Sequence, residues 1–340
     1  MRRLSVNTGL VGAAVREWRF INVPDVLKDP RYIPMNEETR SELVAPLFYK
    51  GRIIGVLDLE HTRPNFFNEE HEKILTTLGA QVAIAIENAR LYQAVRRQER
   101  QLERDIAMAR EVQLRLLPTT APEHSNAEMA VRFLPARAIG GDLYDFIDYG
   151  PNRTAIILGD VSGKAAPAAL FAALVSGIMR SAAAHHPEPA RMLVTLNDAI
   201  QERKLESQYV TLLFALWDDE KRTLRVANSG AVQPILCRRG KSTVVKAEGF
   251  PLGLFPDVAY DELQLVTEPG DAIIFISDGI LDAENSQGEM YGDERLSSLL
   301  CAHRDSPAAD IADAVLSDVA RFQGARDRFD DETIIVLRVR

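Results

Sequence analysis

Residues 140–163 read GGDLYDFIDYGPNRTAIILGDVSG, and they contain the pattern from which the fold can be inferred. The apolar run Thr154–Leu158 is typical of a β-strand, and Gly159-Asp160 follows it directly. Asp142 likewise follows two glycines. A carboxylate where a strand meets a loop lies at the rim of a sheet, and glycine lets a ligand approach the backbone closely. One such pair is usually only a turn, so the pattern matters only if it recurs.

The pattern recurs twice near the end of the chain. Ser277-Asp278-Gly279 follows the apolar run Ala272–Ile276, and Asp330-Asp331-Glu332 precedes the run Thr333–Val339. Two unit charges about 5 Å apart repel by roughly 3 kcal/mol at an effective dielectric near 20. Four converging carboxylates would therefore take up protons or separate unless cations held them. Oxygen ligands suit Mg²⁺ or Mn²⁺, and the chain offers no thiolate or imidazole cluster for zinc.

The remaining pattern of residues 121–340 predicts an α+β sandwich. Strands that follow one another through hairpins, with helices in separate blocks, favour such a sandwich over a doubly wound parallel sheet. The further expected strands are Ala130–Leu134, Tyr209–Trp217, Leu224–Ala227 and Ile235–Arg238, and the expected helices are Ala165–Ala184, Pro189–Arg203, Glu294–Cys301 and Pro307–Phe322.

A long helix is expected to lead into this region. Residues 87–117 contain neither glycine nor proline, and apolar residues such as Leu91, Val95 and Leu102 follow heptad spacing, with a stutter between Leu102 and Ile106. A dimeric coiled coil is favoured over a single helix lying on its own domain, because the repeat lasts about four heptads. The sequence thus divides into a first domain at 1–90, a helical linker at 91–120 and a last domain at 121–340.

Residues 1–90 read as mixed α/β. Leu43–Phe48 and Arg52–Leu59 predict a hairpin around Lys50-Gly51. A helix is expected to begin at Asn68, because this residue is a good N-cap and three glutamates follow it within the first turn.

Composition excludes several classes of protein. The chain has 40 basic and 49 acidic side chains and a sequence pI near 5.3, which argues against non-specific binding to nucleic acid. The only cysteines are Cys237 and Cys301, so a disulfide framework is absent and a cytoplasmic location is expected. No apolar run is long enough to span a membrane, and polar residues interrupt the apolar stretch that a signal peptide starting at Met1 would need.

The four acidic motifs, in this order, resemble those of the PPM family of metal-dependent protein phosphatases, specifically its SpoIIE-like branch. The likeness extends over roughly residues 103–340. It includes, besides the acidic motifs, Ala109-Arg110-Glu111-Val112-Gln113, Leu116-Leu117-Pro118, Leu134-Pro135-Ala136, Pro167-Ala168-Ala169-Leu170, Asn228-Ser229-Gly230 and Pro251-Leu252-Gly253-Leu254.

The resemblance implies an α-β-β-α sandwich with two Mg²⁺ or Mn²⁺ ions at one end. Asp160 would bridge both ions and, with Asp278, would act in catalysis through a metal-activated water. Many family members have a histidine after the bridging Asp-Gly as a proposed general acid, whereas this chain has Val161-Ser162, so that role has no residue assigned. The implied metal ligands are Asp142, directly or through water, Asp160, the carbonyl of Val161, Asp278 and Asp330, with Asp331 as the alternative to Asp330.

The first 90 residues resemble a GAF domain. The likeness covers most of residues 8–92 and is carried by Val23-Pro24-Asp25-Val26, Ala45-Pro46-Leu47, residues 51–57 and the helix that ends at 87–91. A complete GAF domain has a further helix and two strands before the stretch that matches Gly9–Phe20, so an incomplete sheet is expected. A domain that binds a small molecule and one that only dimerises are equally compatible with the sequence.

The favoured interpretation is a cytoplasmic signalling phosphatase. The resemblance implies hydrolysis of phosphoserine or phosphothreonine on a partner protein, an anti-anti-sigma factor of the STAS type. The GAF domain would control it through a homodimer formed by residues 87–117, which would reposition the helix that begins near Ala165. Two alternatives are a catalytically silent scaffold that binds a partner, and a diguanylate cyclase, whose signature Gly140-Gly141-Asp142-Leu143-Tyr144 superficially resembles.

Overall fold

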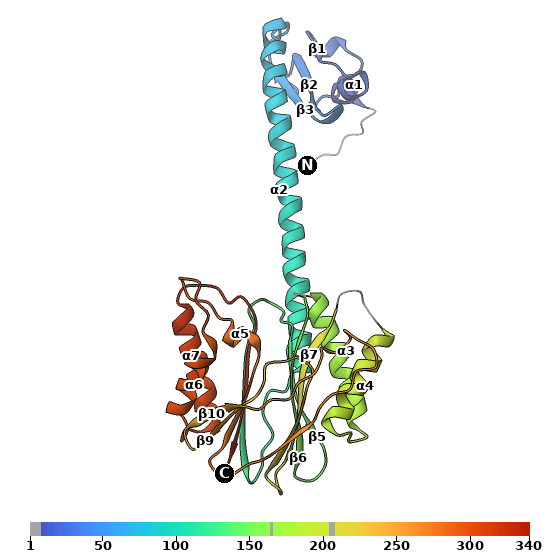
Figure 1. The fold of residues 1–340 in the computed structure, drawn as a ribbon. Helices are drawn as coiled ribbons and strands as arrows, with labels where there is room; N and C mark the ends of the chain where they lie inside the picture. Colours follow the sequence, from blue (N-terminus) through green and yellow to red (C-terminus); the bar gives the residue numbers. More distant parts are fainter. Residues whose placement is uncertain (1–7, 164–165, 204–207) are drawn as a thin grey trace. The chain divides into compact units, whose positions relative to one another are not determined.

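The computed structural model of the chain describes residues 8–163, 166–203 and 208–340. It divides into two compact units, one up to Leu102 and one from Glu103 onward. Helix α2 (Glu69–Leu116) begins in the first unit and ends in the second (Figure 1). The helix predicted to start at Asn68 and the linker helix predicted at 87–117 are therefore one continuous helix. No helix in the described ranges is both long and apolar enough to cross a membrane.

The first unit contains the predicted hairpin. A three-stranded sheet has the order β1 (Ile21–Val23), β2 (Ser41–Tyr49), β3 (Arg52–His61). Both residues of the β2–β3 turn have positive φ angles, as a tight two-residue hairpin turn requires. Two elements that the sequence did not predict, helix α1 (Gly9–Glu17) and strand β1, complete this unit, together with the short 3₁₀ helix η1 (Val26–Lys28).

The second unit is an α-β-β-α sandwich, as expected. Its two five-stranded sheets have the orders β10-β9-β12-β13-β4 and β11-β8-β7-β6-β5, and every strand pairing among the described residues is antiparallel. The strands are β4 (Ala127–Leu134), β5 (Asp142–Asp148), β6 (Arg153–Val161), β7 (Val210–Asp218), β8 (Thr223–Asn228), β9 (Ile235–Arg238), β10 (Lys241–Val244), β11 (Leu263–Val266), β12 (Ala272–Ile276) and β13 (Glu332–Val339).

Helices cover the outer face of each sheet. Helices α3 (Ala166–Ala183) and α4 (Pro189–Glu202) contact β5 to β8, whereas α7 (Ala308–Gln323) lies on β4 and β13, and α6 (Gly292–Ala302) lies against α7 and β10 (Figure 1). A further short helix, α5 (Asp278–Leu281), follows β12.

Three apolar layers hold the sandwich together, one between the sheets and one under each helix pair. The neighbours Ile156 and Ile157 of β6 illustrate the arrangement, because they point to opposite faces and both are fully buried. Burial of such a side chain contributes about 1.5–3 kcal/mol. Sheets buried on both faces explain why the strands read as continuous apolar runs.

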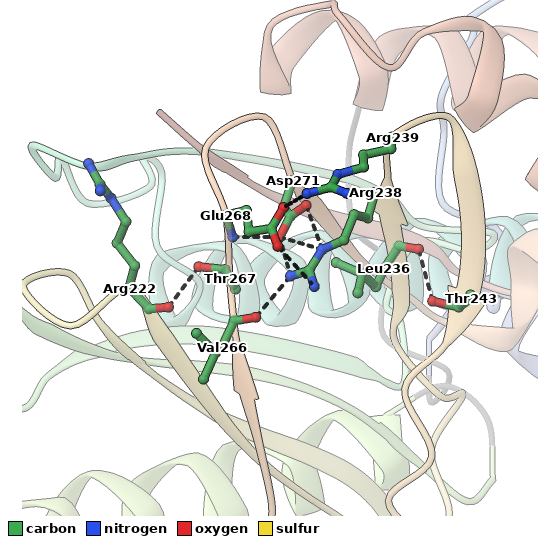
Figure 2. A network of polar contacts seen from close by, with 9 residues as sticks. All are labelled: Arg222, Leu236, Arg238, Arg239, Thr243, Val266, Thr267, Glu268 and Asp271. Carbon is green, nitrogen blue, oxygen red and sulfur yellow. Dashed lines mark hydrogen bonds and ion pairs between the residues drawn. The ribbon is translucent and has the colours of Figure 1, made fainter.

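A network of polar contacts links the two sheets near the start of β12, which is the end of that strand remote from Asp278 (Figure 2). Arg238 of β9 donates hydrogen bonds to both carboxylate oxygens of Asp271, at 3.0 and 2.6 Å, and to the carbonyl of Val266, at 2.8 Å. Asp271 is 2% exposed and also accepts the amide of Glu268. Because Arg238 and Val266 belong to different sheets, the network ties the two sheets together.

The prediction of the first acidic motif needs correction. Residues 142–148 form the strand β5, which was not among the expected strands. Asp142 lies at the start of this strand, as a strand-end position requires, whereas Asp145 lies inside it. The strands β10 and β11, which are largely exposed, and the four-residue helix α5 were also not predicted. The expected helix start at Ala165 lies outside the described residues.

Candidate active site

The acidic motifs of both sheets lie at one end of the sandwich. Asp142 at the start of β5 is the direct cross-strand partner of Asp160 near the end of β6. In the facing sheet, the end of β12 pairs with the start of β13, so Asp278 and Asp331 lie beside each other at neighbouring strand ends. The fold therefore brings the four motifs together.

Asp331 joins the two sheets through its carboxylate. One oxygen accepts the backbone amide of Ala136 at 2.8 Å, and the other accepts the amides of Gly141 at 2.7 Å and Asp142 at 3.3 Å. The residue is 3% exposed. Its oxygens are thus occupied in holding the 136–142 loop against β13, whereas Asp330 is only half-buried and its Oδ1 accepts the amide of Asp331.

The glycines of the motifs are required by close packing between loops. A Cβ atom on Gly141 would lie 2.9 Å from Asp160 Oδ1 and 3.2 Å from the carbonyl oxygen of Val161. These two oxygens are therefore directed toward the same small space beside Gly141. A Cβ on Gly279 would lie 2.1 Å from the carbonyl oxygen of Asp331, a distance that no side chain tolerates.

Burial, together with the charges of neighbouring carboxylates, raises the pKa of the carboxylates at this end of the sandwich. Burial, followed by the charges of Asp278 and Asp330, raises the pKa of Asp160 to about 7. Burial and the charge of Asp330 also raise the pKa of Asp278. Asp142 is fully buried, and its pKa is raised well above the usual value although Thr333 donates a hydrogen bond to it.

These residues provide the donor set that a hard divalent cation prefers. Two oxygens, from Asp160 and Val161, face one space, and the carboxylates of Asp278 and Asp330 are close enough to affect Asp160. Within the described ranges, no group of three or more His, Cys, Asp or Glu side chains is arranged to hold a metal ion as it stands. The carboxylates would have to rotate toward one another to share an ion.

A pocket of about 280 Å³ adjoins the carboxylates. Asp160 and Asp278 line it, together with the loop that follows β8 and the start of β7. A second, smaller crevice lies between Arg137, Gly141 and Asp330. Among the described residues that line these two spaces, Arg137 is the one with a positive charge.

Gln113 contacts this site, although no functional role was expected for it from the sequence. The Gln113 amide nitrogen donates to the carbonyl oxygen of Gly140 at 2.7 Å, and its oxygen accepts the Gly140 amide at 3.1 Å. Gln113 is 9% exposed, whereas its neighbours Val112 and Leu114 are 61% and 43% exposed. On an ordinary helix surface the apolar residues are buried and the polar ones exposed, and here the opposite holds. This signal for Gln113 depends on burial, which the sequence alone does not give.

Ser277 also went unassigned, although it links the two strand ends of the second sheet. Its hydroxyl donates to the carbonyl oxygen of Asp331 at 2.9 Å and accepts the amide of Thr333 at 2.9 Å. Since Asp278 follows directly, this contact fixes the position of β12 and Asp278 relative to Asp331.

Comparison with known proteins relates both parts of the chain to described families. Residues 150–340 match the family described as stage II sporulation protein E (SpoIIE), which covers more than half of the chain, and residues 1–86 match the GAF domain family. The chain is 26% identical over 249 residues to phosphoserine phosphatase RsbU of Bacillus subtilis, with 73% of each chain covered. It is 24% identical over 244 residues to phosphoserine phosphatase RsbP of the same organism, with 70% of this chain and 58% of RsbP covered.

A solved structure agrees with the fold. The SiaA-PP2C domain of Pseudomonas aeruginosa superposes with a TM-score of 0.64 at 22% identity, and the match covers 71% of this chain and 98% of that one. This likeness concerns the path of the backbone.

Proposed function

We propose that this chain hydrolyses phosphoserine or phosphothreonine with the help of two divalent cations, Mg²⁺ or Mn²⁺. The chain belongs to the family of stage II sporulation protein E (SpoIIE) and is a phosphoprotein phosphatase. The observation that carries this proposal is the space beside Gly141. Asp160 Oδ1 and the Val161 carbonyl oxygen both face it, and the charges of Asp278 and Asp330 lie near enough to add to the effect of burial in raising the pKa of Asp160. Such a group of carboxylates is stable and ionised when cations are bound.

We assign Asp160, the Val161 carbonyl, Asp278 and Asp330 as the metal ligands. Asp331 is a positioning residue, because its oxygens already accept backbone amides. Asp142 acts at most through water, since Thr333 holds its carboxylate. When bound, two divalent cations acidify a shared water and neutralise phosphoryl oxygens.

The chain's own residues would orient the substrate. The pocket beside Asp160 and Asp278 is open to a phosphorylated side chain, and Arg137 lines the second crevice together with Asp330. An arginine there would bind phosphoryl oxygens by charge-assisted hydrogen bonds. The donor of the leaving-group proton stays unassigned.

The partner protein is the finer part of the proposal. RsbU and RsbP are named phosphoserine phosphatases, and we propose a phosphorylated STAS-type anti-anti-sigma factor as substrate in the cytoplasm. A silent scaffold would not need an intact carboxylate set. A diguanylate cyclase would need Gly140 and Gly141 at a nucleotide, whereas both are packed against Gln113 and Asp331.

Regulation is proposed to pass through α2. Leu91, Val95 and Leu102 are each more than half exposed, so a second copy of the helix would bury them in a parallel coiled coil. The GAF domain would alter this dimer on binding a small molecule, or would only support it. The pair Gln113–Gly140 offers a route from α2 to the acidic loop that does not depend on a helix start at Ala165, which the described residues do not include.

Hydrolysis of p-nitrophenyl phosphate with Mn²⁺ tests the proposed chemistry. The wild type should release phosphate only with the metal, and Asp278→Ala should abolish the activity. The matched control is Asp310→Ala, an exposed acidic residue in the first turn of α7, which should keep most of it. Metal-dependent hydrolysis that survives Asp278→Ala unchanged would rule out this site.

A further inference from the structure

An exposed apolar cluster lies on the loop between β10 and β11. Residues 249–256 read GFPLGLFP, and Phe250, Leu254 and Phe255 are 59%, 41% and 48% exposed. The rings of Phe250 and Phe255 contact each other edge to face, with centroids 5.4 Å apart. We name these three residues the aromatic rim. Contiguous exposed apolar groups of this kind typically mark an interaction site.

The loop that carries the aromatic rim is held rigidly. Leu252 forms a two-way backbone bridge with Val210, at 2.8 and 3.0 Å. The fully buried Asn197 of α4 accepts the amide of Gly253 at 2.9 Å and donates to the carbonyl of Phe255 at 3.0 Å. The rings are therefore exposed on an ordered scaffold, which leaves them little freedom to turn inward and reduces the entropy lost when a partner binds.

The aromatic rim is continuous with the pocket beside the carboxylates. Pro251, next to Phe250, packs on Gly230: a Cβ atom there would lie 3.2 Å from the proline Cγ. Gly230 lines the pocket, and so does Tyr209, which is 40% exposed and precedes the bridge residue Val210. A molecule seated on the rim would thus reach the pocket.

We propose that the aromatic rim binds apolar side chains that flank the phosphorylated residue of the protein substrate. The inference rests on the proposed phosphatase function. A permanent partner or a second copy of the chain on the aromatic rim would block access to the adjoining pocket. A substrate protein would occupy the rim and the pocket together, and only during turnover, so a substrate is the occupant that we favour. Aromatic side chains in such positions commonly dominate the binding energy of an interface.

Two phosphoserine peptides test the proposal, identical except that one has leucine and phenylalanine and the other serine and glycine on either side of the phosphoserine. With Mn²⁺, the wild type should show a kcat/KM at least about fivefold higher for the apolar peptide, mainly through KM. The variant Phe250→Ser/Leu254→Ser/Phe255→Ser should lose this preference and keep its rate on p-nitrophenyl phosphate within about twofold. Met290→Ser, at a 62% exposed apolar residue in the loop before α6, should behave as the wild type does.

Each outcome decides between the claims. Equal kcat/KM values for the two peptides in the active wild type, or a preference that persists in the triple variant, would overturn the proposed role of the aromatic rim. The proposed phosphatase function would be unaffected by either result. If the triple variant loses its aryl phosphatase activity through misfolding, the single variant Phe250→Ser takes its place and should reduce the preference by about half. No metal-dependent turnover by the wild type on any of the three substrates would overturn both claims.

Discussion

Gln113 of α2 and Gly140 of the first acidic motif exchange two hydrogen bonds, one through each polar atom of the side-chain amide. The next residue, Gly141, donates its amide to Asp331 and borders the space that Asp160 and Val161 face. The end of the long helix is thus separated from the proposed metal site by two consecutive glycines. A shift of Gln113 along the helix axis would necessarily break one or both bonds.

Replacing Gln113 should weaken catalysis without touching the carboxylates. Gln113→Ala leaves the buried amide and carbonyl of Gly140 without partners, at about 1–3 kcal/mol for each group, so the 136–142 loop should relax. We expect kcat on p-nitrophenyl phosphate to fall at least about fivefold and the Mn²⁺ requirement to rise. Arg110→Ala, at an exposed position of the same helix, is the control; equal rates for both variants and the wild type would refute the coupling.

Asp330 and Asp331 should differ in the kind of damage their loss causes. Asp330→Asn removes a proposed ligand, so activity should drop at least about 100-fold while the melting temperature in EDTA stays that of the wild type. Asp331→Asn removes an acceptor of backbone amides and should lower the free energy of unfolding by about 1–3 kcal/mol even in EDTA. Thermal unfolding and Mn²⁺-dependent hydrolysis measure the two effects, and the reverse pattern would exchange the roles of the residues.

Gly141 should not tolerate a methyl group. Gly141→Ala places Cβ 2.9 Å from Asp160 Oδ1, so the carboxylate must move away from the proposed ligand position, and kcat/KM should fall about 100-fold. Gly177→Ala in α3 is the matched control, because a Cβ there meets nothing within 4 Å. It should raise stability by about 0.5–1 kcal/mol. Full activity of Gly141→Ala would show that the space beside it is not used.

The network around Asp271 should matter for stability alone. Arg238→Met leaves a buried carboxylate with fewer donors, at about 1–3 kcal/mol of unfolding free energy. Since this network lies at the end of β12 remote from Asp278, the rates of hydrolysis should stay within about twofold of the wild type. Urea denaturation measures the free energy of unfolding, and hydrolysis of p-nitrophenyl phosphate with Mn²⁺ measures the rate. A large loss of kcat in a folded variant would contradict the claim that this network affects stability alone.

Strong local patterns predicted much of the sandwich. Ile235–Arg238 and Ala272–Ile276 have the predicted bounds, because burial on both faces makes such strands apolar throughout. The strand at residues 142–148 was not predicted, because it contains acidic residues, although Asp142 and Asp145 are buried in the structure. Tertiary contacts with Thr333 and Arg180 make that burial possible, and no local pattern contains them.

The candidate site depended on topology in the same way. The residues beside each acidic motif identified it, but only the family resemblance implied that the motifs converge. Gly141 and Asp331 are in contact although they belong to motifs on different sheets, and a contact of that kind cannot be predicted from local sequence. The glycines were interpreted as giving room to a ligand. The structure adds that Gly140 and Gly279 give room to Asp331 itself.

The central claim is that Asp160 holds divalent cations at the end of the sandwich. Calorimetric titration of the metal-free full chain with Mn²⁺ tests it most directly, on the wild type and on Asp160→Asn. Two ions per wild-type chain are expected, and the Asp160→Asn variant should lose at least one of them because a proposed ligand is removed. Equal binding of Mn²⁺ by the two proteins, or none by the wild type, would contradict the account.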